Sequence, residues 1–167
     1  MPTATAVSLS EYLNTSYRPD CDFLDGQLLE RNVGEWVHSR LQSLLTRYLD
    51  NREKQWGIWV VMAQRVQVAA RRFRIPDITV IVGGPPDGPI ITKPPFLLIE
   101  ILSPGDRVAE MQDRIGDYFS FGVHYVWLIN PRTRQTYIYT AAGIQESRDG
   151  VLTTENPDIR VVLDELE

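Results

Sequence analysis

The sequence has a single cysteine, few lysines and no long apolar run, and each shortage excludes a class of protein. Cys21 has no partner for an internal disulfide, and one thiolate cannot build a cysteine-based zinc site. No apolar stretch reaches the ~18 residues that a membrane span needs. The opening residues MPTATAVSLS lack the basic and apolar regions of a secretory signal. We therefore expect a cytoplasmic protein with no membrane partner.

Positive charge is also scarce. The chain has 17 Lys and Arg residues against 22 Asp and Glu residues, a formal net charge of -5. Such a chain carries no general basic coat for nucleic acid, so binding DNA would require a local basic groove. The densest basic cluster is Arg71, Arg72 and Arg74. It is either a solvated hairpin turn or a set of phosphate contacts, since electrostatic contacts dominate non-specific binding of nucleic acid.

The overall composition is that of a globular protein. With 167 residues, 43% hydrophobic and 23% charged, we expect one domain over residues 1–167 with a substantial core. Hydrophobic periodicity, caps and turn signals predict a mixture of helices and strands, an α/β (α+β) arrangement. The expected helices cover residues 8–17, 35–54 and 106–121. The expected strands cover residues 21–24, 27–31, 58–70, 78–82, 96–102, 124–129, 135–140 and 159–163.

Two carboxylates interrupt apolar strand sequences. Asp77 precedes the run ITVIV, and Glu100 lies within FLLIEIL. An ionised carboxylate among aliphatic side chains is costly unless it is paired, and a divalent cation is one common partner. If the two strands pair across the Gly- and Pro-rich segment 83–95, Asp77 and Glu100 come within reach of one metal ion.

An ordered set of motifs along nearly the whole chain resembles the Uma-type family of restriction-endonuclease-like proteins, within the PD-(D/E)XK nuclease superfamily. The matching pieces are LDGQL at 24–28, His38 in a helix, RIPD at 74–77, PPFLLIEILSP at 94–104, Tyr118, GV at 122–123 and YVWLINP at 125–131. The resemblance implies a restriction-endonuclease-like fold, in which a mixed β-sheet is flanked by helices and accompanied by additional β-hairpins.

The resemblance also implies a site. Asp77, Glu100 and the backbone carbonyl of Ile101 would hold Mg²⁺ or Mn²⁺, and His38 would orient a water or a phosphate. The superfamily's lysine two residues after the glutamate is absent, because Leu102 stands there. The resemblance further implies that members of the family carry a lysine on the following helix, at the position where this chain has Arg114. Arginine keeps the charge and grips a phosphate, but its pKa is too high for a general base.

Several functions remain open at this point. The first is a Mg²⁺-dependent endonuclease acting on DNA, for which a homodimer would supply one site per strand. The second is a nuclease-fold protein that has lost turnover and serves as a nucleic-acid-binding or interaction module. The third is a hydrolase of another phosphate ester. For His38 and Arg114 the structural alternatives are a half-buried histidine bonded to backbone and an arginine whose stem packs on the core.

Overall fold

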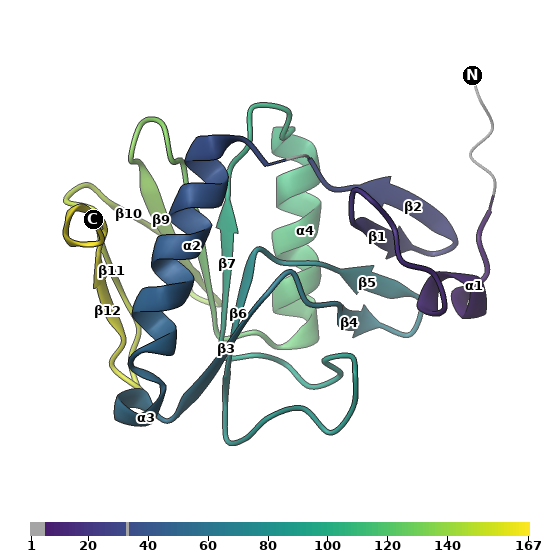
Figure 1. The fold of residues 1–167 in the computed structure, drawn as a ribbon, viewed down its shortest axis with the longest axis horizontal. Coiled ribbons are helices and arrows are strands. Elements are labelled where there is room, and N and C mark those ends of the chain that lie inside the picture. The colour runs from purple at the N-terminus through teal and green to yellow at the C-terminus, as the bar shows by residue number, and fades with distance from the viewer. Residues whose placement is uncertain (1–5, 33) are drawn as a thin grey trace.

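The computed structural model describes residues 6–32 and 34–167, and its centre is a six-stranded mixed sheet in the order β10-β9-β8-β7-β6-β3 (Figure 1). β7 and β8 are parallel, and the other neighbours are antiparallel. α4 makes the crossover between β7 and β8. The bounds are β3 Ile58–Met62, β6 Ile78–Val82, β7 Leu97–Ile101, α4 Val108–Phe121, β8 Tyr125–Ile129, β9 Thr136–Thr140 and β10 Gly143–Ser147.

Helices cover both faces of this sheet. α2 (Trp36–Asp50) buries Leu41, Leu45 and Leu49 in one apolar cluster, which also contains Ile99 of β7. α4 buries Met111, Ile115 and Tyr118 in a second cluster with Leu98, the residue next to Ile99. Because side chains alternate along a strand, neighbouring residues of β7 serve opposite layers. Glu100 shares the face of Leu98 and therefore points toward α4.

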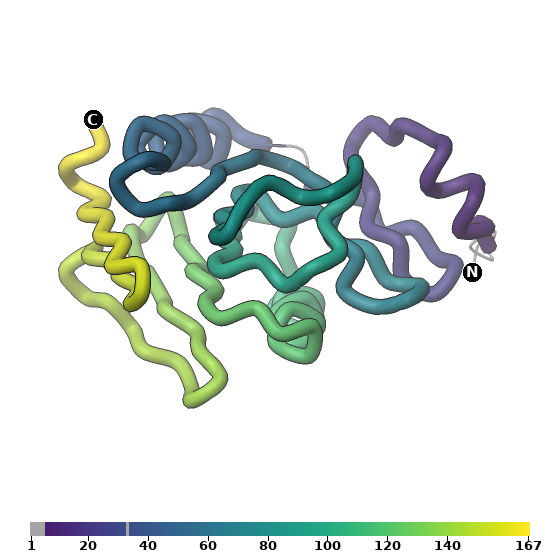
Figure 2. Tube along the Cα trace, turned by 90° about the horizontal axis from the view of Figure 1, so that it is seen from below, coloured from purple at the N-terminus to yellow at the C-terminus, as the bar shows by residue number. Residues whose placement is uncertain are grey.

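A smaller sheet, in the order β2-β1-β5-β4, extends to one side of the large one (Figures 1 and 2). It consists of β1 (Cys21–Leu24), β2 (Gln27–Glu30), β4 (Val66–Ala69) and β5 (Arg72–Arg74). Asp25 and Gly26 turn the first hairpin with φ of 51° and 98°, the positive values that such two-residue turns require. This arrangement joins the N-terminal part of the chain to the segment just before Asp77.

The expected helix at 8–17 is shorter, α1 (Leu9–Leu13), although Ser8 caps it as predicted by accepting from the backbone N–H of Glu11. The helix expected at 35–54 divides into α2 and the short α3 (Glu53–Trp56). The single strand expected at 58–70 is wrong: β3 and β4 belong to different sheets. Ala63, with φ of 49°, breaks the extended backbone between them.

The C-terminal segment adds a hairpin of β11 (Val151–Thr153) and β12 (Arg160–Val162), followed by a 3₁₀ turn at Leu163–Glu165. Leu152, Val161 and Leu163 are buried in the cluster on the α2 side. Within the part of the chain that the structure describes, no helix is both long and apolar enough to cross a membrane.

Candidate active site

Asp77 and Glu100 lie side by side at one end of the large sheet. β6 and β7 are antiparallel and pair Ile78 with Ile99, so the next position along this ladder places Asp77 opposite Glu100. Residues opposite each other on neighbouring strands share a face of the sheet. The hairpin-like pairing across residues 83–95 therefore forms as predicted, and it brings the two carboxylates together.

Asp77 is held by groups from β7 and α2. The backbone N–H of Ile101 donates to Oδ2 at 2.7 Å, and His38 Nε2 lies 3.3 Å from Oδ1. One turn after His38 on α2, the Gln42 amide donates to the backbone oxygen of Asp77 at 2.9 Å. His38 therefore faces the carboxylate rather than a backbone group, and its Nδ1 has no hydrogen-bond partner within the described residues.

Glu100 is fully buried, and its oxygens face two different elements. Tyr118 of α4 donates its hydroxyl to Oε1 at 2.5 Å. Arg31, directly after β2, places Nη2 3.0 Å from Oε2 and 3.5 Å from Asp77 Oδ1. One guanidinium nitrogen thus lies between the two carboxylates.

Arg114 lies behind Glu100, away from Asp77. Its Nη2 is 2.7 Å from Asp22 Oδ2, its Nη1 is 3.7 Å from Glu100 Oε1, and its side chain is 5% exposed. Asp22, in β1, also accepts from the Ile75 N–H at 3.0 Å. Arg114 thus pairs closely with Asp22 of the small sheet, whereas its Nη1 faces Glu100 without a hydrogen bond within the described residues. The arginine that contacts Asp77 is Arg31.

The basic cluster before Asp77 divides into different environments. Arg74 has a side chain that is 1% exposed and is paired with Asp22, Asp113 and Asp117. Arg72 contacts Asp113 and Asp117 as well as Asp25. Phosphate contacts by all three arginines were one of the two alternatives for this cluster, and in this arrangement Arg72 and Arg74 are already paired with carboxylates of α4. Arg71, in the turn between β4 and β5, is exposed.

Sequence reasoning missed Arg31 and Asp22. Asp22 gave the same signal as Asp77 and Glu100, a carboxylate inside an apolar strand (CDFL), and that signal was sufficient to identify it. Arg31 gave none, because an arginine after an exposed hairpin strand is ordinarily solvated. Its place at the site depends on how the small sheet docks, which no local pattern specifies.

Burial raises the pKa of each of the two carboxyl groups, whereas the neighbouring positive charges lower it. Burial would raise the pKa of Asp77, but the hydrogen bond from His38, the charge of Arg31 and the N–H of Ile101 together lower that pKa below its ordinary value. At Glu100 burial dominates and raises the pKa, although the charges of Arg31 and Arg114 oppose it. Burial also keeps the pKa of Tyr118 well above its ordinary value, so its hydroxyl remains a donor.

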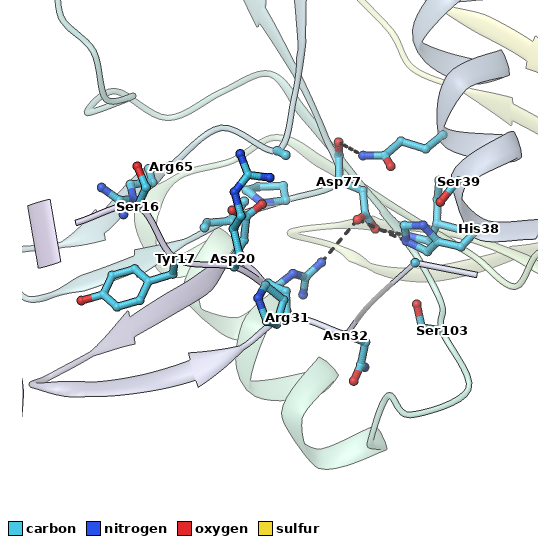
Figure 3. Close-up of a pocket in the computed structure, with 18 of the residues that line it drawn as sticks. Ser16, Tyr17, Asp20, Arg31, Asn32, His38, Ser39, Arg65, Asp77 and Ser103 are labelled. Atoms are coloured by element: carbon cyan, nitrogen blue, oxygen red, sulfur yellow. Dashed lines mark hydrogen bonds and ion pairs between the residues drawn. The ribbon is translucent and has the colours of Figure 1, made fainter. Parts of the chain in front are cut away.

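A polar pocket of about 1020 Å³ opens beside Asp77 (Figure 3). Arg31, His38 and Asp77 line it together with the segment 13–20, whereas Glu100 and Arg114 do not. Three arginines (Arg18, Arg31, Arg65) and three aspartates (Asp20, Asp77, Asp106) line it, so the pocket carries both charges in equal number. Of the two central carboxylates, Asp77 is the one through which a ligand in the pocket would meet the site.

The oxygen donors fit a hard divalent cation. Mg²⁺ prefers oxygen ligands and is commonly held by one or two carboxylates while it keeps several waters. Asp77 Oδ1 and Glu100 Oε2 already converge on one positive nitrogen, as they would on a metal. Among residues 6–32 and 34–167 no group of three or more His, Cys, Asp or Glu side chains is arranged to hold a metal ion.

The contact between His38 and Asp77 gives a prediction for pH dependence. Burial would lower the pKa of His38, but the hydrogen bond and the charge of Asp77 outweigh it and raise the pKa above 6.5. The protonated imidazole therefore stabilises the fold fully below pH 6.5, and this contribution is lost as pH rises through the folded-state pKa. We expect the free energy of unfolding of wild type, measured with urea, to fall relative to that of His38→Gln as pH rises above 6.5. The same pH profile in both proteins would contradict the assignment.

Comparisons with known proteins identify the family and the fold. The family model Uma2, described as "Putative restriction endonuclease", matches residues 9–166. The crystal structure of a "putative nuclease" from Anabaena variabilis ATCC 29413 is similar, with a TM-score of 0.83 and 19% sequence identity over 96% of this chain and 97% of that chain. No curated protein matches. The mixed α+β fold predicted from the sequence is confirmed, and the chain belongs to the Uma2 family of restriction-endonuclease-like proteins.

Proposed function

We propose that this protein is a metal-dependent endonuclease that hydrolyses phosphodiester bonds of DNA at Asp77 and Glu100. One observation carries the proposal: two buried carboxylates from neighbouring strands direct an oxygen each at the same nitrogen of Arg31, at 3.5 and 3.0 Å. A fold has little structural reason to bury two acids at one point, because desolvating them is costly. A cation site beside a polar pocket is a functional reason for it.

Asp77, Glu100 and the backbone carbonyl of Ile101 would hold Mg²⁺ or Mn²⁺. Bound there, such an ion lowers the pKa of a coordinated water and neutralises charge on the phosphate oxygens. Support for DNA as the substrate comes from the family description and from the three arginines, Arg18, Arg31 and Arg65, that line the pocket. Arg71, exposed in its turn, is a candidate contact for more distant phosphates.

The chain's own residues have separable tasks in this proposal. His38 hydrogen-bonds Asp77 and positions its carboxylate, and as a neutral imidazole it can accept a proton from a water in the pocket. Tyr118 fixes the orientation of Glu100 from α4 through its hydrogen bond, and Arg114 places a positive charge 3.7 Å from the same oxygen. Arg31 offers the pocket a guanidinium that can hold a phosphate through two hydrogen bonds.

A second candidate is a nuclease-fold protein that binds nucleic acid without turnover. It is favoured by Arg114, which cannot serve as a general base, and by the position of both lysines. Lys54 lies in α3, and Lys93 lies on the 83–95 segment with a side chain that is 83% exposed; neither lines the pocket. Water activation would then depend on the metal and on His38.

Incubating supercoiled plasmid and single-stranded DNA with the purified protein tests the proposal. We expect nicking with Mg²⁺ or Mn²⁺, none with EDTA, and none by Asp77→Ala, because that variant lacks the carboxylate that faces the pocket. Asp87→Ala is the matched control, since Asp87 is 87% exposed on a distant loop.

Cleavage by Asp77→Ala at the wild-type rate would overturn the assignment of the site. Arg114→Lys separates the two candidate functions. DNA binding by wild type without cleavage, together with cleavage by Arg114→Lys, would support the second candidate. Absence of cleavage in both proteins would contradict the first candidate for these substrates, and fluorescence anisotropy with labelled DNA then measures whether binding remains.

A further inference from the structure

Arg31 lies where the proposed site would hold a cation. Its Nη2 is 3.0 Å from Glu100 Oε2 and 3.5 Å from Asp77 Oδ1. Tyr118 holds the other oxygen of Glu100 and Ile101 holds the other oxygen of Asp77, while His38 Nε2 also lies 3.3 Å from Asp77 Oδ1. A metal ion and this guanidinium nitrogen therefore compete for the same two acceptors.

Arginines already compensate the central carboxylates while Arg31 is in place. Asp77 and Glu100 share Arg31, Glu100 also faces Arg114, and Asp22 pairs with Arg114 and Arg74. A divalent cation that entered beside Arg31 would place two positive groups against each other in a region of low dielectric. The electrostatic cost of binding the metal falls if the guanidinium leaves, and it falls further if an anion arrives with the metal.

Arg31 is the guanidinium best placed to leave. Its side chain is 16% exposed and lines the pocket, whereas those of Arg114 and Arg74 are 5% and 1% exposed. The backbone of Arg31 is fixed, since its N–H donates to the Asp20 carbonyl at 2.7 Å. A change of side-chain rotamer is therefore enough to turn the guanidinium from the carboxylates into the pocket.

We propose that Arg31 is an internal counter-ion that occupies the metal position in the free protein, and that it turns into the pocket to bind a phosphate when a divalent cation enters. This inference rests on the proposed function of the same site. Metal and phosphodiester then bind cooperatively, because each favours the same position of Arg31. By linkage, the factor by which DNA tightens metal binding equals the factor by which metal tightens DNA binding.

Mn²⁺ binding tests this without any turnover. Free Mn²⁺ is counted by electron paramagnetic resonance in titrations with and without a short single-stranded phosphorothioate oligonucleotide. We expect Arg31→Gln to bind Mn²⁺ about tenfold or more tightly than wild type, within the range usual for such couplings. The oligonucleotide should tighten Mn²⁺ binding in wild type and do so much less in Arg31→Gln.

Two variants serve as controls. Arg18→Gln removes a positive charge from the same pocket but contacts neither Asp77 nor Glu100, so it reports the general electrostatic effect and should leave the Mn²⁺ affinity within about threefold of wild type. Arg31→Lys keeps a cation at this position and should stay closer to wild type than Arg31→Gln. A measurement on wild type does not depend on whether the variants fold. In a Mg²⁺ titration followed by NMR, the Nε–Hε signal of Arg31 should shift and that of Arg74 should not.

The possible results are distinguishable. Equal Mn²⁺ affinity in wild type and Arg31→Gln, with binding lost in Asp77→Asn, would refute the role of Arg31 and leave the proposed metal site intact. An equal gain in Arg18→Gln and Arg31→Gln would also refute it, because pocket charge alone would then explain the effect. Absence of Mn²⁺ binding in every protein, with and without oligonucleotide, would refute the proposed function and this inference together.

Discussion

Replacing Arg74 by methionine is expected to destabilise the protein by about 3–5 kcal/mol, the usual loss when one partner of a buried ion pair is removed. The Arg74 guanidinium contacts Asp22 at 3.2 Å and Asp113 and Asp117 at 2.7 Å each. Methionine fills much of the volume but leaves the fully buried Asp22 with one fewer positive partner. Domains of this kind are stable by about 5–15 kcal/mol in total, so the variant would lose a large share of its stability.

Urea unfolding followed by circular dichroism measures this loss. Arg72→Met is the matched control, because Arg72 contacts two of the same carboxylates but its side chain is 24% exposed. We expect the control to lose about 1 kcal/mol or less, as exposed ion pairs do. Similar losses in the two variants would show that burial of the network contributes little.

Replacing Glu100 by glutamine is expected to reduce DNA cleavage by about 10³-fold if the proposed function holds. A correctly held metal ion supplies several kcal/mol of transition-state stabilisation, and each 1.36 kcal/mol corresponds to a factor of ten in rate. Glutamine keeps the shape of the side chain, but it removes the charge that attracts the cation. Initial nicking rates on supercoiled DNA over a range of Mg²⁺ concentrations give the measurement.

Glu110→Gln makes the same chemical change on the exposed side of α4 and should cleave at the wild-type rate. Circular dichroism spectra and unfolding midpoints establish that both variants are folded. A folded Glu100→Gln protein that cleaves within about threefold of wild type, a difference under 1 kcal/mol in the barrier, would remove Glu100 from the catalytic site.

The pairing of β6 with β7 in the large sheet was predictable from the sequence. Aliphatic runs at 78–82 and 96–102, separated by a segment that can only be a loop, predicted the β6–β7 pairing, and the period of two placed Asp77 beside Glu100. The strand predicted at 58–70 was wrong because periodicity within an apolar run does not reveal one residue of positive φ. Ala63 is neither glycine nor asparagine, the residues that usually mark such a position.

The ion pairs around the site were not predictable from local patterns. The cluster of Arg71, Arg72 and Arg74 reads as free positive charge until α4 is placed against it. The regularly spaced acids Asp113 and Asp117 likewise read as a solvated face, yet both contact Arg74 and Arg72. The basic cluster and the acidic face each have the sequence pattern of a surface segment, but together they form one partly buried network of ion pairs. This network becomes apparent only when the small sheet is docked on α4.

The pairing of Asp22 with Arg74 and Arg114 has a consequence for synthesis on the ribosome. The hairpin that carries Asp22 emerges early, whereas its two arginines are translated later. Until the helix with Arg114 has left the exit tunnel, Asp22 has no complete set of partners and remains hydrated, since burying it alone would be costly. The N-terminal hairpin should therefore dock late in the growing chain, and ribosome-bound chains that stop before residue 114 should leave it open to proteases.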